Sequence, residues 1–171
     1  ALLQDIDPRI RARVKALALD SYTHGAVFLD EALHVIRPTI VWTDQRSTAE
    51  CAWLRERHFD LVYGTACQAP APTWTLPQLL WLRQAEPEQF ARIRRISFVK
   101  DYVRFLLTGE LACDVIEAQG SMLWDLRAGA WSEALCALAG VAPEWLPRTG
   151  APTDPAGRIT ARAAAETGLP Q

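Results

Sequence analysis

Asp114 is the residue whose type and surroundings point most directly to chemistry. It lies in the segment ELACDVIE, after small or apolar residues and just before the β-branched Val115 and Ile116. A carboxylate in such a setting is expected to lose part of its hydration, and a buried charge persists only where it is paired or used. The residues alone leave two interpretations open: a working carboxylate, or the N-cap of a turn over residues 116–119.

Three further side chains could hydrogen-bond or stack on a ligand. His24, in the segment THG, can both donate and accept hydrogen bonds, although a histidine at a strand end can equally be satisfied within the fold. Asp44, in VWTDQR, has Arg46 two residues further on, so these two can pair with each other. Trp74, in PTW, can line a pocket or anchor its own loop.

Composition and charge exclude several classes of function. The 171 residues are 50% hydrophobic and 22% charged, as in soluble globular proteins. A net charge of −2 provides no basic field for nucleic acid or an anionic membrane. The four cysteines form no C-x-x-C pair, the three histidines lack metal-ligand spacing, and no signal peptide or long apolar run is present. We therefore expect a reduced, cytoplasmic protein with no metal site, nucleic-acid partner or membrane span.

Apolar spacing and turn residues predict the elements that must position these side chains. Strands are expected at residues 15–20, 25–30, 35–42 and 96–99, with a hairpin turn at residues 30–33. Residues 63–75 are predicted to be a loop because Pro70 and Pro72 break regular structure. Helices are expected over residues 1–13, 47–57, 77–83, 87–94, 100–108, 132–140 and 160–167. Strands interleaved with helices predict an α/β domain.

Several blocks, in this order along the chain, resemble the FGGY carbohydrate kinases, and the xylulokinase branch in particular. The resemblance covers nearly the whole chain, from about residue 15 to residue 170. The blocks are THG (23–25), RPTIVWTDQRSTAEC (37–51), TLPQLLWLRQAEPEQFARI (75–93), KDYVRFLLTGE (100–110) with Asp114 after it, LWDLRAGAWSEAL (123–135) and GRITARAAAETGLP (157–170).

The resemblance implies a ribonuclease-H-like, actin-type ATPase fold with a mixed sheet and flanking helices. It also implies that residues 1–171 are a single partial domain, the sugar-binding N-terminal half without the family's first β-hairpin. The ATP-binding half would lie outside this chain, so ATP and Mg²⁺ would be held mainly elsewhere. The chain begins at Ala1 without a methionine, in keeping with that expectation. The fragment alone is then expected to be inactive.

Site roles also follow from the resemblance. Asp114 aligns with the catalytic base that accepts the proton of the sugar hydroxyl during phosphoryl transfer, which needs little other covalent help from the protein. Thr23 and His24 match a pair that contacts the ketose. Trp42 and Asp44 fall where relatives place an aromatic wall and polar rim, and Thr73 and Trp74 match a loop that lines the pocket. The implied partners are a small sugar and ATP, and the full-length protein is compatible with a homodimer.

Departures from the family pattern keep other functions open. Ile116 and Glu117 replace the usual serine and acidic or asparagine residue, and Gln78 replaces a common lysine. These changes alter the sugar-facing surface and leave the proton acceptor in place. The prediction is ATP-dependent phosphorylation of a ketopentose such as xylulose. The alternatives are a glycerol or other polyol kinase of the same family, and a non-catalytic sugar-binding domain.

Overall fold

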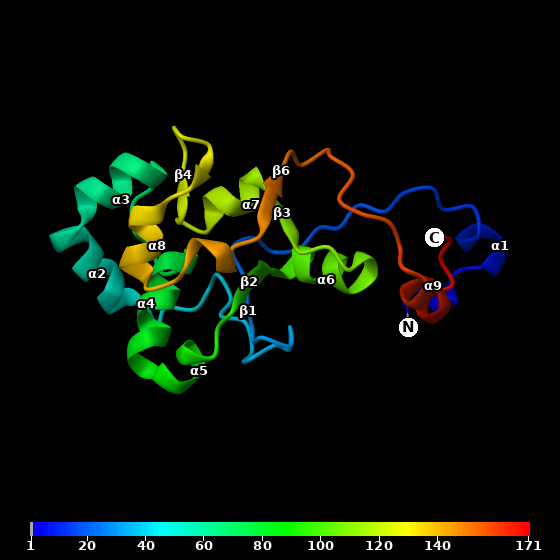
Figure 1. The fold of residues 1–171 in the computed structure, drawn as a ribbon, viewed down its shortest axis with the longest axis horizontal. Helices are drawn as coiled ribbons and strands as arrows, with labels where there is room; N and C mark the ends of the chain where they lie inside the picture. Colours follow the sequence, from blue (N-terminus) through cyan, green and yellow to red (C-terminus); the bar gives the residue numbers. More distant parts are fainter. Residues whose placement is uncertain (1) are drawn as a thin grey trace.

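The computed structural model describes residues 2–171, in which short strands alternate with helices (Figure 1). The α-helices are α1 (Pro8–Arg11), α2 (Thr48–Arg57), α3 (Phe59–Ala66), α4 (Thr75–Ala85), α5 (Pro87–Ala91), α6 (Val99–Thr108), α7 (Val115–Gly120), α8 (Glu133–Ala139) and α9 (Ala161–Thr167). The strands are β1 (Ala26–Leu29), β2 (Arg95–Phe98), β3 (Ala112–Asp114), β4 (Trp124–Asp125), β5 (Ala130–Trp131) and β6 (Arg148–Gly150). Single 3-10 turns cover Leu2–Asp5 and Pro143–Trp145.

The strands pair two by two. β1 and β2 are antiparallel, β3 and β6 are parallel, and β4 and β5 form an antiparallel hairpin. The β1–β2 pair brings together segments separated by four helices, with Ala26 opposite Phe98. This pairing places the residues just before β1 beside the start of α6, where the N–H of Val99 donates to the carbonyl of Gly25 at 3.1 Å.

The main core lies between β1, β2 and a group of helices centred on α4. Four leucines of α4 are fully buried, and α4 contacts α2, α5 and α8. Such burial on several faces is the behaviour of a central helix, in contrast to a surface helix with one apolar stripe. A smaller cluster surrounds Phe98, Cys113, Ala118 and Trp124. It packs β2, β3, α7 and β4 together.

The two ends of the described chain lie together, away from this core. Figure 1 shows α1 and α9 side by side, joined to the body by two extended segments. The Arg11 side chain donates to the carbonyl of Thr167 at 3.1 Å, and the N–H of Thr160 donates to the carbonyl of Leu107 at 2.9 Å. These contacts attach α9 to both α1 and the C-terminal end of α6.

Several predicted elements are confirmed by the structure. The strand at residues 25–30 is β1, the strand at residues 96–99 is β2, and the predicted helices correspond to α2, α4, α5, α6, α8 and α9. Gly109 ends α6 in the left-handed conformation, with φ 77°, at the boundary expected from the helix predicted over residues 100–108. In the segment predicted to be helical at residues 1–13, the structure has Leu2–Asp5 and α1; Ala1 lies outside the described residues.

Three predictions of secondary structure were wrong. Residues 15–20 are extended and mostly exposed, because no neighbouring strand within residues 2–171 supplies hydrogen bonds to them. Residues 35–42 form only one bridge, Leu29 to Val35, after the predicted turn, since Pro38 has no N–H to continue a ladder. Residues 63–66 belong to α3, which ends at Cys67 with φ 55° before the prolines begin. Strands β3 to β6 are two or three residues long and were not predicted.

Candidate functional site

Asp114 stands at the end of β3 and caps α7. Its Oδ1 accepts hydrogen bonds from the N–H groups of Ile116 at 3.0 Å and Glu117 at 2.9 Å, which is the N-cap that the sequence left open. Its Oδ2 lies 2.9 Å from Lys100 Nζ. Burial favours the neutral acid, but the Lys100 ammonium and the two N–H groups outweigh it and hold the pKa of Asp114 below its ordinary value.

Lys100 collects three carboxylates around one ammonium group. Its Nζ lies 2.9 Å from Asp114 Oδ2, 3.0 Å from Asp101 Oδ1 and 3.5 Å from Glu117 Oε2. Asp101 is almost completely buried and also pairs with Arg104 at 3.1 Å. Burial lowers the pKa of Lys100, but the surrounding carboxylates reverse the sign and raise it, so this ammonium stays charged. Three carboxylates against two cations leave a net charge of −1 in this cluster.

His24 connects this cluster to an aromatic ring. Its backbone is left-handed, with φ 67°, and its N–H donates to Glu117 Oε1 at 2.8 Å. Its imidazole packs edge-on against the indole of Trp74, with ring centroids 4.6 Å apart. Burial lowers the pKa of His24, so the ring is neutral at neutral pH and can both donate and accept hydrogen bonds.

Trp74 is fixed by the loop before α4. Its indole N–H donates to the carbonyl of Ala69 at 3.1 Å, and the buried Gln78 amide donates to the carbonyl of Pro72 at 3.0 Å. The N–H of Leu76 donates to the carbonyl of Ser121 at 3.0 Å, which ties the start of α4 to the end of α7. Trp74 therefore anchors its loop and also meets His24, and its role in lining a pocket stays a prediction.

The segment around Trp42 and Asp44 is organised locally. Asp44 pairs with Arg46 at 2.8 Å, and the Arg46 guanidinium lies over the Trp81 ring at 4.7 Å. The pairing that the sequence left open is thus present, and the Arg46 hydrogen bonds lower the pKa of Asp44. Trp42 is 56% exposed. Within residues 2–171, no hydrogen bond, ion pair or ring contact connects Trp42 or Asp44 to His24, Trp74 or the carboxylates around Lys100.

The predicted site residues differ in whether they contact one another. The structure brings His24, Trp74 and Asp114 into one connected group through Glu117 and Lys100. Thr73 is half-buried beside Trp74, and its carbonyl lies 3.5 Å from the Gln78 amide. Thr23 is exposed, directly before His24. This group combines hydrogen-bonding side chains with an aromatic ring.

The comparison with known families agrees with the resemblance read from the sequence. The model for the FGGY family of carbohydrate kinases, N-terminal domain, matches residues 5–171. The chain belongs to the FGGY family of carbohydrate kinases. It is 38% identical over 124 residues to the xylulose kinase of Escherichia coli (strain K12), a match that covers 71% of this chain and 25% of that protein.

Two further relatives match a larger share of this chain. The xylulose kinase of Klebsiella pneumoniae is 32% identical over 157 residues, which cover 92% of this chain and 32% of that protein. The crystal structure of a xyloylose kinase from Brucella ovis has a TM-score of 0.88 at 33% identity, covering 95% of this chain and 33% of that chain. The predicted actin-type ATPase fold is confirmed. The present chain spans at most about a third of the length of each of these relatives.

Sequence reasoning missed three residues that hold this site together. Neither Lys100 nor Gly120 was singled out as a site residue from the sequence, and Glu117 was treated as a departure from the family pattern. Glu117 is nevertheless 4% exposed, whereas its neighbour Ile116 is 61% exposed. An acidic residue inside the short apolar run VIEA carried the same signal of a buried, paired charge that singled out Asp114.

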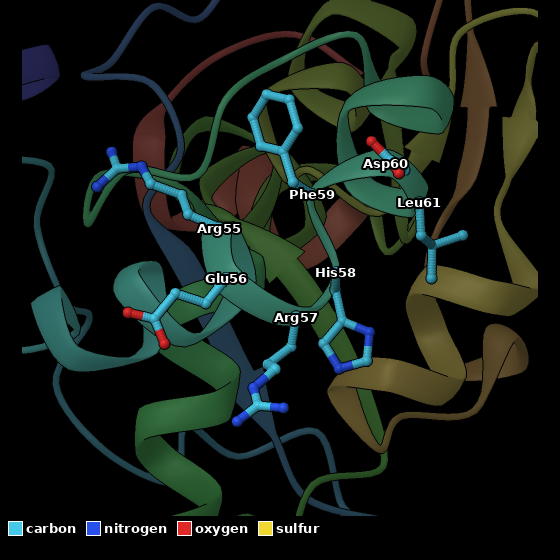
Figure 2. A pocket seen from close by; sticks show the side chains of 7 residues that line it. All are labelled: Arg55, Glu56, Arg57, His58, Phe59, Asp60 and Leu61. Carbon is cyan, nitrogen blue, oxygen red and sulfur yellow. The ribbon is translucent and has the colours of Figure 1, made fainter.

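One surface hollow of this chain lies elsewhere. It encloses about 340 Å³ at the junction of α2 and α3 and contains none of the predicted site residues. Figure 2 shows its side chains fanning outward from the junction without converging on a common point. We therefore place the candidate site at His24 and Trp74.

No helix among residues 2–171 is long and apolar enough to cross a membrane.

Proposed function

We propose that this chain supplies the sugar-binding part of an enzyme that transfers a phosphoryl group from ATP to a hydroxyl of a ketopentose, with xylulose as the first candidate. The observation that carries the proposal is the neutral imidazole of His24 held against Trp74, in a chain of the FGGY carbohydrate kinase family. An imidazole beside an indole offers a donor or acceptor next to an apolar face, which suits a polyhydroxy ligand.

The charge of the site supports a neutral sugar. Asp101, Asp114 and Glu117 outnumber Lys100 and Arg104 by one charge, and the nearby imidazole is neutral. An excess of negative charge disfavours a carboxylate or phosphate on the substrate and has little effect on an uncharged ketose. A substrate panel of xylulose, ribulose, gluconate and glycerol, assayed with ATP on the complete protein carrying this sequence, should rank the pentuloses first by kcat/KM. Glycerol or gluconate ranking first would overturn the substrate assignment, and sugar binding without turnover would leave the non-catalytic alternative.

The finer hypothesis gives Asp114 the role of general base. A base must keep a lone pair directed at the sugar hydroxyl, but Oδ1 already accepts two N–H groups and Oδ2 faces Lys100. A carboxylate has about four lone-pair positions, so one remains for a ligand. The lowered pKa keeps Asp114 ionised and also makes it a weaker proton acceptor. These contacts support the capping and ion-pairing role more strongly than the role of base.

Asp114→Asn separates these roles in the complete protein. Asparagine caps a helix about as well as aspartate, so α7 should stay intact. A general base predicts a fall in kcat of about 10²–10⁴-fold with a modest change in KM. A kcat within a few-fold of the wild-type value would instead assign Asp114 to the support of the site.

We infer that ATP and Mg²⁺ are bound outside residues 2–171, and that residues 1–171 form one partial domain of the enzyme. Among the described residues, no group of three His, Cys, Asp or Glu side chains is placed to hold a metal ion. The acidic group around Lys100 does not fit Mg²⁺, because the ammonium already occupies the space between the carboxylates. The isolated chain should therefore bind ATP weakly and show no turnover, which titration calorimetry and a coupled ADP assay would measure.

A further inference from the structure

We propose that Glu117 and Gly120 are positioning residues that fix His24, with Lys100 neutralising Glu117 from behind. The proposal rests on the proposed function only where it assigns His24 to sugar binding. The positioning itself follows from the contacts of His24. Glu117 and Gly120 stand three positions apart on α7, so they share one face of that helix.

The backbone of His24 needs an external partner. A left-handed conformation is uncommon for a residue other than glycine and persists only where the surrounding structure fixes it. Glu117 Oε1 accepts the His24 N–H at 2.8 Å, a charge-assisted hydrogen bond between residues 93 positions apart. This bond holds the peptide of His24 against α7 at the point where the chain enters β1.

Glu117 is buried beside the ammonium group of Lys100. Its side chain is 3% exposed, and Lys100 Nζ lies 3.5 Å from Oε2. The two carboxylate oxygens are thus divided, one facing the His24 N–H and the other facing the ammonium. A buried carboxylate without such partners would be strongly unfavourable.

Gly120 fixes the ring of His24. A Cβ at position 120 would lie 2.0 Å from His24 Nδ1 and 2.2 Å from Cε1, so the imidazole packs directly on the glycine backbone. Nδ1 is buried there without a hydrogen-bond partner. Trp74 contacts the same ring at 4.6 Å between centroids. With Nδ1 turned into the protein, Nε2 is the nitrogen that remains to meet a ligand.

The test combines ligand binding with a direct probe of His24, both in the complete protein. Glu117→Gln keeps an acceptor oxygen but loses the charge, Glu117→Ala removes the acceptor, and Gly120→Ala pushes the ring away. Xylulose affinity is measured by calorimetry without ATP. The environment of the imidazole is followed through its Cε1–H signal in an NMR spectrum, assigned with His24→Asn.

We expect xylulose binding to weaken by about fivefold in Glu117→Gln and by about tenfold or more in the other two variants. The His24 signal should shift in all three. Two matched controls should leave both readouts unchanged: Glu50→Gln, which makes the same change at a buried glutamate of α2, and Gly64→Ala, where an added Cβ meets nothing within 4 Å. Melting temperatures verify that each variant is folded.

The outcomes separate the positioning from the proposed function. An unchanged His24 signal in folded Glu117→Ala and Gly120→Ala would overturn the positioning proposal. A shifted signal with wild-type xylulose affinity would support the positioning and overturn the assignment of His24 to the sugar site. If the wild-type protein bound no pentulose at all, the proposed function would fail, and the NMR comparison would still decide the positioning.

Discussion

The ionic cluster around Lys100 and the ion pair between Asp44 and Arg46 both lie in segments that match the family pattern, but they differ in what they connect. Asp44 and Arg46 are two residues apart, with side chains 22% and 36% exposed, and they organise one loop. The Lys100 cluster joins α6, β3 and α7, and through Glu117 it reaches His24, two residues before β1. A short-range pair organises its own loop, whereas a buried long-range network determines where the side chain of His24 lies.

Removing the central cation should produce the largest effect. Lys100→Met leaves three carboxylates close together without their shared ammonium, which should lower the free energy of unfolding by about 3 kcal/mol. Urea denaturation of the complete protein would measure this loss. Lys15→Met is the matched control, since Lys15 is exposed and its replacement should stay within about 0.5 kcal/mol. Equal losses in the two variants would contradict the central role of Lys100.

Acidification should reveal the pairing of Asp114. The pKa of Asp114 in the folded protein is below its ordinary value of 3.8. Its contribution to stability is therefore fully present above about pH 4 and is lost as the pH falls through the folded pKa. Urea denaturation between pH 6 and pH 3 should show stability falling more steeply in the wild type than in Asp114→Asn. Parallel curves would mean that the Asp114 carboxylate gains nothing from Lys100 and α7.

The local pair should matter least. Arg46→Met removes an exposed salt bridge and a cation–π contact with Trp81, and it should cost about 1 kcal/mol or less. Xylulose affinity should stay at the wild-type value, because Asp44 and Arg46 make no contact with His24 among the interactions of residues 2–171. Calorimetry would check this, and a tenfold loss of affinity would place the Trp42–Arg46 loop in the binding site.

Features that depend on contacts within a few residues could be predicted from the sequence, whereas features that depend on long-range contacts could not. The cap at Asp114, the end of α6 at Gly109 and the pairing of Asp44 with Arg46 are decided within a few residues, and each was open to inference from the chain alone. Residues 15–20 were misread because a strand needs a partner, and the pattern of one segment does not show whether a partner exists.

The long-range part of the site could not be predicted from local pattern. Glu117 and His24 are 93 positions apart, and only the packing of β1, α6 and α7 brings them within 2.8 Å. The need for glycine at position 120 arises from an imidazole far away in the chain. The family resemblance pointed to His24 as a sugar contact, but the residues that support it emerged only from the structure.

The most direct measurement of the central claim is xylulose binding by His24→Asn in the complete protein, compared with the wild type by calorimetry. Asparagine tolerates the left-handed backbone of position 24 and removes only the imidazole. The account predicts binding about 10- to 100-fold weaker, with the melting temperature nearly unchanged. Wild-type affinity in this variant would contradict it.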